Sequence, residues 1–263
     1  MGNPARDMVV KIIGDNRPDL FYYKADVEAR RGIRVRTSGD AIDIIRSDER
    51  QIIRISRKNA VYLVDMINSF AYFFGSAAPV KTRVRGAICD LVDFSTPRLH
   101  HVAGFEDFAI LCPSLTEPYM TTEQYLDFAS IGEGDIAIDL GSYSALTSIA
   151  FSKAVGATGK VIALEPDPLN YFSAEANIES HKRVNGLDNI TLLPAAVSDK
   201  EGVLQLSSEG AMGSALTSIV GSYRGETTEV KCVTLQGLVD QFALPRVDFI
   251  KMDIEGAELS VIL

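Results

Sequence analysis

Apolar residues follow two different periods in the second half of the chain. Four short apolar runs are typical of buried strands: DIAIDLG (135–141), KVIALEP (160–166), NITLLPAAVSD (189–199) and VDFIKMDIEG (247–256). The segments between them place apolar residues at helical spacing, and Asp167 with Pro168 supply an N-cap and first turn for a helix that Gly186 ends. Strands that alternate with helices predict a parallel sheet with helices on both faces.

The preceding part of the chain predicts a different architecture. The β-branched runs IRVRT, DAIDIIR and QIIRIS between residues 33 and 56 are separated by turn-forming residues and indicate strands. Residues 60–80 are rich in apolar and aromatic residues and predict a buried helix. Asp65 and Pro79 interrupt the apolar run, which is therefore too short to span a membrane. We therefore expect an α/β chain with two parts, a smaller α+β module over residues 1–116 and a parallel-sheet core over 117–263.

Composition excludes several classes of function. The 263-residue chain has 35 acidic and 26 basic residues, a net charge of −9, which argues against a nucleic-acid partner because phosphate binding needs a basic face. The three cysteines are far apart without metal-ligand spacing, so no zinc site is expected and a reducing cytoplasm is the predicted location. His100 and His101 are neighbours in a predicted strand, point to opposite faces and cannot share a site.

The carboxyl ends of the predicted core strands carry the candidate chemistry. The first strand ends with Asp139, Gly141, Ser142 and Tyr143, in a loop that leads into a helix. The dinucleotide and P-loop glycine motifs are both absent, which disfavours those functions. Glu165 ends the second strand about 26 residues after Asp139, where a nucleoside-binding α/β fold places an acid on the ribose hydroxyls.

The fourth strand ends in charged residues. Asp253 and Glu255 fall at the same edge of the sheet, and Lys251 lies inside the strand. A buried ammonium group needs a carboxylate partner or a route to a polar pocket, so we interpret these charges as part of a site. A purely structural ion-pair cluster is the alternative. A metal held by Asp253 and Glu255 lacks a third ligand in the sequence, and none is predicted.

These blocks, in this order, resemble the FkbM-like S-adenosylmethionine-dependent methyltransferases. The similarity covers roughly residues 117–263, and EPDP (165–168) and KMDIEGAE (251–258) are its most specific parts. It implies a Rossmann-like methyltransferase core, S-adenosyl-L-methionine as cofactor and methyl transfer to a hydroxyl of a sugar, glycan or natural product. The resemblance therefore implies a small-molecule or carbohydrate acceptor. We also expect no membrane span and allow for a homo-oligomer.

The resemblance also implies roles for individual residues. The loop residues Asp139, Gly141, Ser142 and Tyr143 match the surroundings of the methionine part of the cofactor, and Glu165 matches the ribose acid. Ala196, at the end of the third strand, matches the region along the adenine edge. Asp253 matches the residue that faces the transferred methyl group, and Lys251 and Glu255 are further elements of the catalytic pattern.

The sequence departs from the family pattern in two respects. Tyr143 and Ala145 replace an asparagine and a glycine of the first loop; if that position has a positive φ, alanine costs about 1–2 kcal/mol there. The chain also ends one helical turn after the fourth strand, which indicates a truncated core. Both departures support an alternative function, a non-catalytic Rossmann-like binding module with a degraded cofactor loop. A nucleotide-sugar or NAD enzyme is a third, less favoured possibility.

Overall fold

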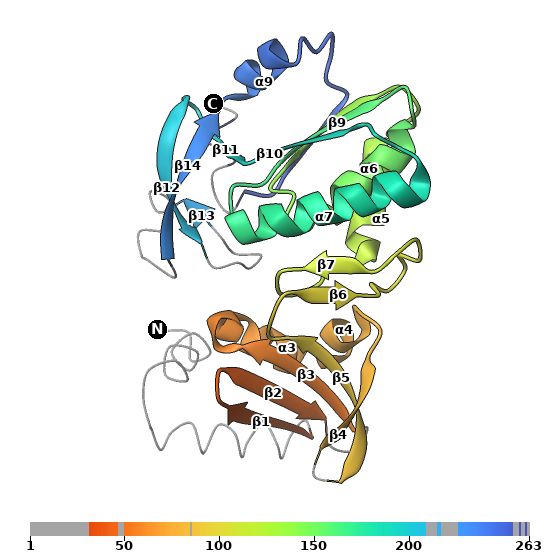
Figure 1. Cartoon of the computed structure of the whole chain (residues 1–263), viewed down its shortest axis with the longest axis vertical. Coiled ribbons are helices and arrows are strands. Elements are labelled where there is room, and N and C mark those ends of the chain that lie inside the picture. Colours follow the sequence, from red (N-terminus) through yellow and green to blue (C-terminus); the bar gives the residue numbers. More distant parts are fainter. Residues whose placement is uncertain are drawn as a thin grey trace.

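The computed structural model describes residues 32–46, 50–84, 86–208, 215–216, 226–254, 258 and 261. Figure 1 shows an N-terminal sheet at one end of the molecule, an α/β core at the other, and a two-stranded hairpin between them. Glu255 and most of the residues that follow it lie outside the described residues. The α/β class predicted from the sequence, a parallel-sheet core preceded by a smaller α+β module, is confirmed.

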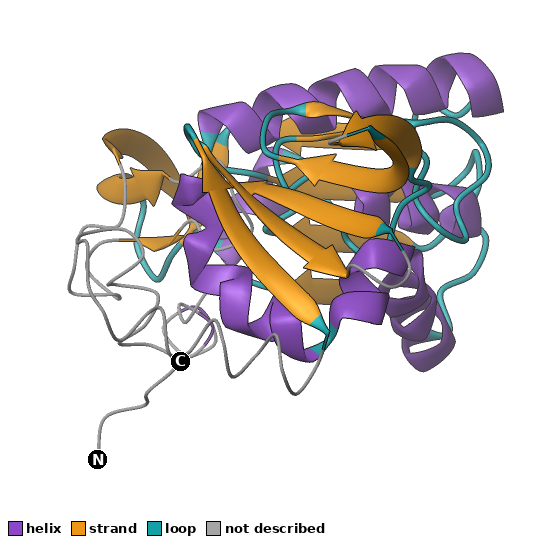
Figure 2. Ribbon diagram, turned by 90° about the horizontal axis from the view of Figure 1, so that it is seen from below, coloured by secondary structure: helices purple, strands orange, loops and turns teal. Residues whose placement is uncertain are grey.

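The N-terminal sheet has the order β1-β2-β3-β5-β4. Its strands are β1 (Ile33–Ser38), β2 (Ala41–Arg46), β3 (Gln51–Ser56), β4 (Val80–Val84) and β5 (Ala87–Phe94). Only the β3–β5 pair is parallel. One face of the sheet packs on short helices, and isoleucines from β2 and β3 meet Leu63, Met66 and Phe70 in a common apolar cluster (Figure 2).

The helix expected over residues 60–80 is divided. The chain forms a 3-10 helix η1 (Arg57–Tyr62) and two α-helices, α3 (Leu63–Asn68) and α4 (Phe70–Gly75). Ser69 separates the two α-helices with φ −123° and ψ 42°, outside the helical region. The prediction of a single helix is therefore wrong, whereas its burial is confirmed. Among the described residues, no helix is long and apolar enough to span a membrane.

The core sheet contains the four predicted parallel strands in the order β10-β9-β8-β15. They are β8 (Ile136–Leu140), β9 (Lys160–Leu164), β10 (Ile190–Leu193) and β15 (Phe249–Met252). Side chains alternate across β8, so that Ile136, Ile138 and Leu140 pack in one apolar cluster with Leu238, while Ala137 packs with Phe151 on the opposite face.

Helices cover both faces of the core sheet, as predicted. The helices α5 (Tyr119–Ala129), α6 (Leu146–Val155) and α7 (Pro168–Asn185) lie on the face of Ala137, and α9 (Leu235–Gln241) lies on the face of Ile138. Asp167 caps α7 by accepting from the amides of Leu169 and Asn170, Pro168 is its first residue, and Gly186 ends it with a left-handed φ of 70°. The predicted capping of α7 is confirmed.

A second, smaller sheet interrupts the alternation of strands and helices. Its order is β11-β14-β12-β13, from β11 (Ala195–Val197), β12 (Gly202–Ser208), β13 (Ala215–Leu216) and β14 (Glu226–Val233). The expected third strand, residues 189–199, is divided at Pro194, which has no backbone N–H to donate to a strand ladder. Its prediction as one strand is wrong, and β12 to β14 were not predicted.

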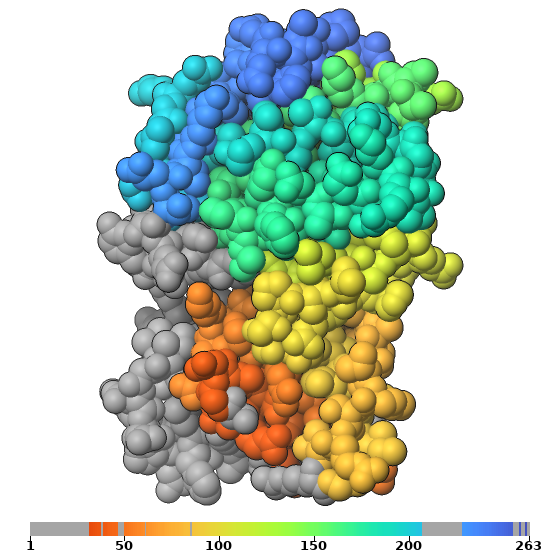
Figure 3. All heavy atoms as spheres, in the orientation of Figure 1, coloured from red at the N-terminus to blue at the C-terminus, as the bar shows by residue number. Residues whose placement is uncertain are grey.

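The hairpin of β6 (Arg98–His100) and β7 (Ile110–Cys112) connects the two parts of the chain. Its loop residues Val102 and Phe105 pack against Leu146 and Ile149 of α6, and Figure 3 shows the hairpin, in yellow, between the N-terminal sheet and the core. The proposed boundary between residues 116 and 117 stays a prediction. His100 is buried and His101 is exposed, as expected for neighbours in an extended strand.

Candidate functional site

The loop after β8 and the end of β9 lie side by side at the carboxyl edge of the core sheet. The backbone amides of Gly141 and Ser142 both donate to the carbonyl oxygen of Leu164, at 3.0 and 2.9 Å. Glu165 follows Leu164 directly, so its carboxylate lies beneath the loop. In open parallel sheets ligands bind beyond this edge.

The Glu165 carboxylate supports the loop. One oxygen accepts from the amide of Tyr143 at 2.7 Å, and the other accepts from the amide of Asp167 at 2.9 Å and the side chain of Asn170 at 3.3 Å. Burial raises the pKa of Glu165 to about 8, although the two backbone amides oppose that rise. Three hydrogen bonds leave lone-pair capacity on the carboxylate for a further donor.

Gly141 is the point where two strand ends touch. It has a φ of 79°, and a Cβ atom placed on it would lie 2.1 Å from the carbonyl oxygen of Asp253. Asp253 itself is held by its amide, which donates to Leu140 at 3.1 Å, and its residue is exposed. Only glycine combines this backbone conformation with so close an approach.

Lys251 is paired with Asp139 inside the core. The two residues face each other in the parallel ladder of β15 and β8, with the ammonium nitrogen 3.2 Å from Oδ1 of Asp139. Nζ also donates to the carbonyl oxygen of Gly141 at 2.7 Å, and Ser148 of α6 donates to Oδ2 of Asp139 at 2.5 Å. The sequence-based expectation that Lys251 has a carboxylate partner is confirmed.

The charges around Lys251 outweigh its burial. Burial alone lowers the pKa of the ammonium group, but the carboxylates of Asp139, Glu117 and Asp253 together raise it above its ordinary value. Lys251 therefore stays protonated at neutral pH. Its hydrogen bond holds the carbonyl of Gly141, and its predicted part in catalysis stays a prediction.

Ser142 and the start of α6 offer unused polar groups. The hydroxyl of Ser142 is buried and has no hydrogen-bond partner in the described part of the chain. The residue that caps α6, Ala145, has no side chain that can accept from the first amides of the helix. Free amide groups at a helix N-terminus favour a carboxylate or another anion, so both features can receive polar groups of a ligand.

Tyr143 points away from the loop that carries it. Its ring is buried, its hydroxyl donates to the carbonyl oxygen of Leu115 at 2.8 Å, and it accepts from the amide of Ser114 at 3.2 Å. Burial raises the pKa of Tyr143 well above its ordinary value, so the phenol stays neutral. Tyr143 thus connects the loop after β8 to the segment after β7. Its backbone amide is part of the site, and its side chain is part of the core.

Ala145 occupies the position at which the family pattern has glycine. Its φ is 61°, in the left-handed region, and its methyl group is fully buried. The condition under which alanine is costly at this position is therefore met. Alanine in this conformation costs about 1–2 kcal/mol.

The strain at Ala145 can be measured by comparison with Ala150, a buried residue in the middle of α6. Both substitutions to glycine lose a buried methyl group and gain unfolded-state entropy, but only Ala145→Gly also removes left-handed strain. We expect Ala145→Gly to be about 1–2 kcal/mol less destabilising than Ala150→Gly in urea unfolding. Equal effects of the two substitutions would show that Ala145 is unstrained.

Glu117 is a member of the charged cluster that the sequence did not reveal. It precedes Pro118 at the start of α5 and accepts from the hydroxyl of Ser144 at 3.1 Å. Burial raises the pKa of its carboxyl to about 7, Lys251 lowers it, and Asp139 raises it. The only signal in the sequence is an acid next to a helix-starting proline, which is too common to identify a site.

Two candidate residues remain, Ala196 and Glu255. Ala196 lies in β11 and pairs with Cys232 of β14, where it packs with Leu206 and Val230 in the small sheet. The prediction that it ends the third core strand is wrong, and its contact with adenine stays a prediction. Glu255 lies outside the described residues. No group of three metal-ligating side chains occurs among the residues that the structure describes.

The parallel sheet, the glycine loop after its first strand and the buried acid after its second strand define a Rossmann-like nucleoside-binding core. The model of the methyltransferase FkbM domain matches residues 129–263, and the chain belongs to this family. The resemblance found in the sequence is thereby confirmed. The cofactor of the family is S-adenosyl-L-methionine.

Three of the solved structures that share partial similarity with this chain are named as methyltransferases. An S-adenosylmethionine-dependent methyltransferase from Aquifex aeolicus is 26% identical over 28% of this chain and 37% of its own, with a TM-score of 0.25. Precorrin-6y C5,15-methyltransferase from Geobacter metallireducens is 22% identical over 30% and 40%, with a TM-score of 0.28. An O-methyltransferase from Thermotoga maritima is 21% identical over 44% and 48%, with a TM-score of 0.28. The chain thus spans less than half of each of these proteins. Comparison with curated proteins gives no match.

The residues at the sheet edge fit this cofactor. The unpartnered hydroxyl of Ser142 and the uncapped amides of α6 suit the charged amino-acid end of S-adenosylmethionine. Glu165 lies at the end of the adjacent strand with lone-pair capacity left for hydroxyl donors. Together these groups are compatible with a ligand that has both a carboxylate and a ribose.

Proposed function

We propose that this chain is an S-adenosylmethionine-dependent methyltransferase that methylates a hydroxyl group of a sugar, glycan or natural product. Membership in the FkbM family over residues 129–263 is the observation that carries this proposal. The cofactor supplies an electrophilic methyl group on a positively charged sulfur atom. The protein has to bind it, orient the acceptor and accept the acceptor's proton.

Cofactor binding is assigned to the loop after β8 and the end of β9. In this proposal Gly141, Ser142 and the backbone of Tyr143 surround the amino-acid end, and Glu165 accepts from the ribose hydroxyls. Asp139 holds this loop through Lys251, which donates to the carbonyl of Gly141. Ala196 is retained in the proposal as an adenine neighbour.

Asp253 is proposed to accept the proton of the acceptor hydroxyl. It is exposed at the end of β15, and its backbone contacts Gly141. As the acceptor oxygen forms its new bond to the methyl carbon, the bond from that carbon to sulfur breaks, and the hydroxyl proton passes to a carboxylate. Glu255 stays a further candidate from the family pattern. A cytoplasmic location and a homo-oligomer also remain predictions.

Calorimetric titration of S-adenosylmethionine into the chain, alongside a thermal melt, tests the proposal. We expect saturable one-to-one binding and an affinity roughly tenfold or more weaker for Glu165→Ala, because its hydrogen bonds to the ribose are lost. Glu175→Ala is the matched control, since Glu175 is exposed on α7. Unchanged affinity in Glu165→Ala would remove Glu165 from the site.

The same titration addresses the alternative function. The strained φ of Ala145 and the replacement of an asparagine by Tyr143 favour a binding module without efficient catalysis. A chain that melts cooperatively and does not bind S-adenosylmethionine would support this alternative and contradict the methyltransferase proposal.

A further inference from the structure

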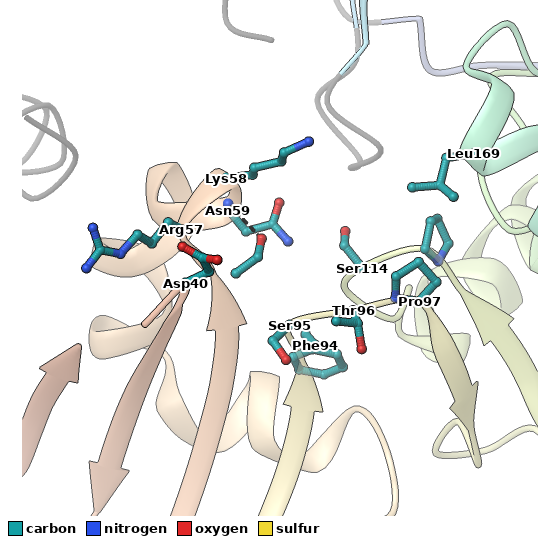
Figure 4. Close-up of a pocket in the computed structure, with 12 residues that line it drawn as sticks. Asp40, Arg57, Lys58, Asn59, Phe94, Ser95, Thr96, Pro97, Ser114 and Leu169 are labelled. Atoms are coloured by element: carbon teal, nitrogen blue, oxygen red, sulfur yellow. Dashed lines mark hydrogen bonds between the residues drawn. The ribbon is translucent and has the colours of Figure 1, made fainter. Parts of the chain in front are cut away.

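A cavity of about 380 Å³ opens between the N-terminal module and the core (Figure 4). Small-molecule sites in proteins are roughly 300–1,000 Å³ in volume, so this cavity can hold a ligand of a few ring atoms with its substituents. Its walls come from segments that are far apart in the sequence. They are residues 40, 56–59, 94–97, 113 and 114 of the N-terminal module and Leu169 of the core.

Asn59 presents an unused amide to this cavity. The residue is only 3% exposed, and its side chain has no hydrogen-bond partner among the described residues, although its backbone amide donates to Ser56. Figure 4 shows the amide directed toward the cavity, with the exposed Lys58 reaching over the same space and Arg57 turned away. At the cavity wall this amide can both donate to and accept from the hydroxyl groups of a ligand.

The other wall groups have complementary chemistry. Asp40 contributes a carboxylate, and Ser56, Ser95 and Thr96 contribute hydroxyl groups. Leu169, together with Pro97 and Pro113, offers apolar surface. An amide both donates and accepts hydrogen bonds, a carboxylate accepts them and an ammonium group donates them. Such a set of groups suits the several hydroxyl groups of a sugar ring. The C–H face of the ring would pack on the apolar wall.

The cavity borders the proposed cofactor loop. Its wall residue Ser114 lies 3.1 Å, hydroxyl to hydroxyl, from Tyr143, whose amide donates to Glu165. Leu169, on the same wall, donates its amide to Asp167, which in turn donates its amide to Glu165. Two independent chains of hydrogen bonds thus connect the cavity wall to the Glu165 carboxylate.

We propose that this cavity binds the methyl acceptor through a hydroxyl-rich ring, and that Asn59 and Lys58 of the N-terminal module recognise its hydroxyl groups. The assignment of the ligand as an acceptor rests on the methyltransferase function proposed above. The N-terminal module thereby selects the acceptor, while the core binds the cofactor. This gives the N-terminal module a function that the family match, which begins at residue 129, does not cover.

Saturation-transfer NMR with methyl α-D-glucoside, methyl α-D-mannoside and methyl β-D-galactoside as probes tests the cavity. We expect saturation transfer to at least one of these glycosides, and binding roughly tenfold weaker in Asn59→Leu, which has a side chain of similar size without the amide. Lys58→Ala is expected to weaken binding as well. Lys160→Ala is the matched control, because Lys160 is exposed at the start of β9, at the opposite edge of the core sheet.

Two results would overturn the cavity as a sugar site. One is the absence of transfer to all three glycosides; the other is transfer that persists at full strength in both Asn59→Leu and Lys58→Ala. A thermal melt of each variant accompanies the titrations. Should Asn59→Leu fail to melt cooperatively, Lys58→Ala decides the outcome, because Lys58 is exposed and outside the core.

Failure of the sugar-site proposal can be distinguished from failure of the proposed methyltransferase function, because glycoside binding and cofactor binding are measured separately. Glycoside binding by a chain that does not bind S-adenosylmethionine would establish the cavity as a sugar site and overturn its assignment to a methyl acceptor. Cofactor binding without glycoside binding would overturn the cavity and leave the proposed methyltransferase function intact. Binding of both, with only glycoside binding reduced in Asn59→Leu, is the result expected from the proposal.

Discussion

Gly141→Ala is expected to destabilise the chain by about 3 kcal/mol or more, because the new methyl group overlaps a backbone carbonyl. The Cβ atom would lie 2.1 Å from the oxygen and 3.1 Å from the carbon of the Asp253 carbonyl group. Neither strand can move away cheaply, since β8 and β15 are paired over four residues up to this point. Thermal melts should show a midpoint lowered by about 10 °C, at roughly 2–4 °C for each kcal/mol.

Gly186→Ala is the matched control for this prediction. Gly186 has a similar φ of 70°, and nothing lies within 4 Å of a Cβ atom placed on it. Its substitution introduces only the left-handed strain. Because alanine also lowers the entropy of the unfolded chain, the net destabilisation should be about 1 kcal/mol. The difference between the two variants therefore measures the overlap at Asp253. Equal melting temperatures would mean that the two strand ends are not in contact.

Lys251→Met is expected to cost about 3–5 kcal/mol of unfolding free energy, because it leaves the Asp139 carboxylate buried without a counter-charge. Asp139 is fully buried, and the Lys251 side chain is 3% exposed. Urea unfolding at neutral pH measures the loss. Adding Asp139→Asn should restore most of the stability, since the double variant no longer contains a buried charge.

The surface pair of Lys153 with Asp107 provides the comparison. Its nitrogen and oxygen are 2.7 Å apart, but the Lys153 side chain is 40% exposed. Solvent screening reduces the value of such pairs, so Lys153→Met should cost about 1 kcal/mol or less. If Lys251→Met were equally mild, the buried pair would contribute no more to the free energy of unfolding than the surface pair does.

The core strands were predictable because each is a short apolar run between turn residues. Lys251 could also be interpreted, since a buried ammonium group requires a carboxylate, and Asp139 is its partner in the ladder. Because parallel strands end at the same edge of a sheet, the charged residues at their carboxyl ends could be predicted to lie on the same side of the core. These inferences depend only on local period and on the cost of burying charge.

Other elements gave a weaker signal. The strand β12 is exposed at Gly202, Val203 and Gln205, so its sequence does not alternate cleanly and its antiparallel pairing with β14 was not predicted. Ser69 can continue a helix by propensity, and its break depends on tertiary packing. Local pattern does not specify either feature.

The candidate acceptor cavity could not be predicted from the sequence. Its walls include Asp40, Asn59, Thr96, Ser114 and Leu169, which no periodicity relates to one another. The same applies to Tyr143, which matches a cofactor-loop position but directs its ring into the core. Contacts between distant segments determine both features, and they become visible only in three dimensions.

The position of the β6–β7 hairpin has a consequence for the order of folding during synthesis. The N-terminal sheet is complete once residue 94 has been made, because all its strands precede that point. The hairpin depends on later residues, since Asn177 of α7 both donates to and accepts from the backbone of Leu111, 66 residues earlier. Ile110, Val102 and Phe105 therefore lack their apolar partners Leu146 and Ile149 until α6 leaves the ribosome, and these side chains stay exposed for that time.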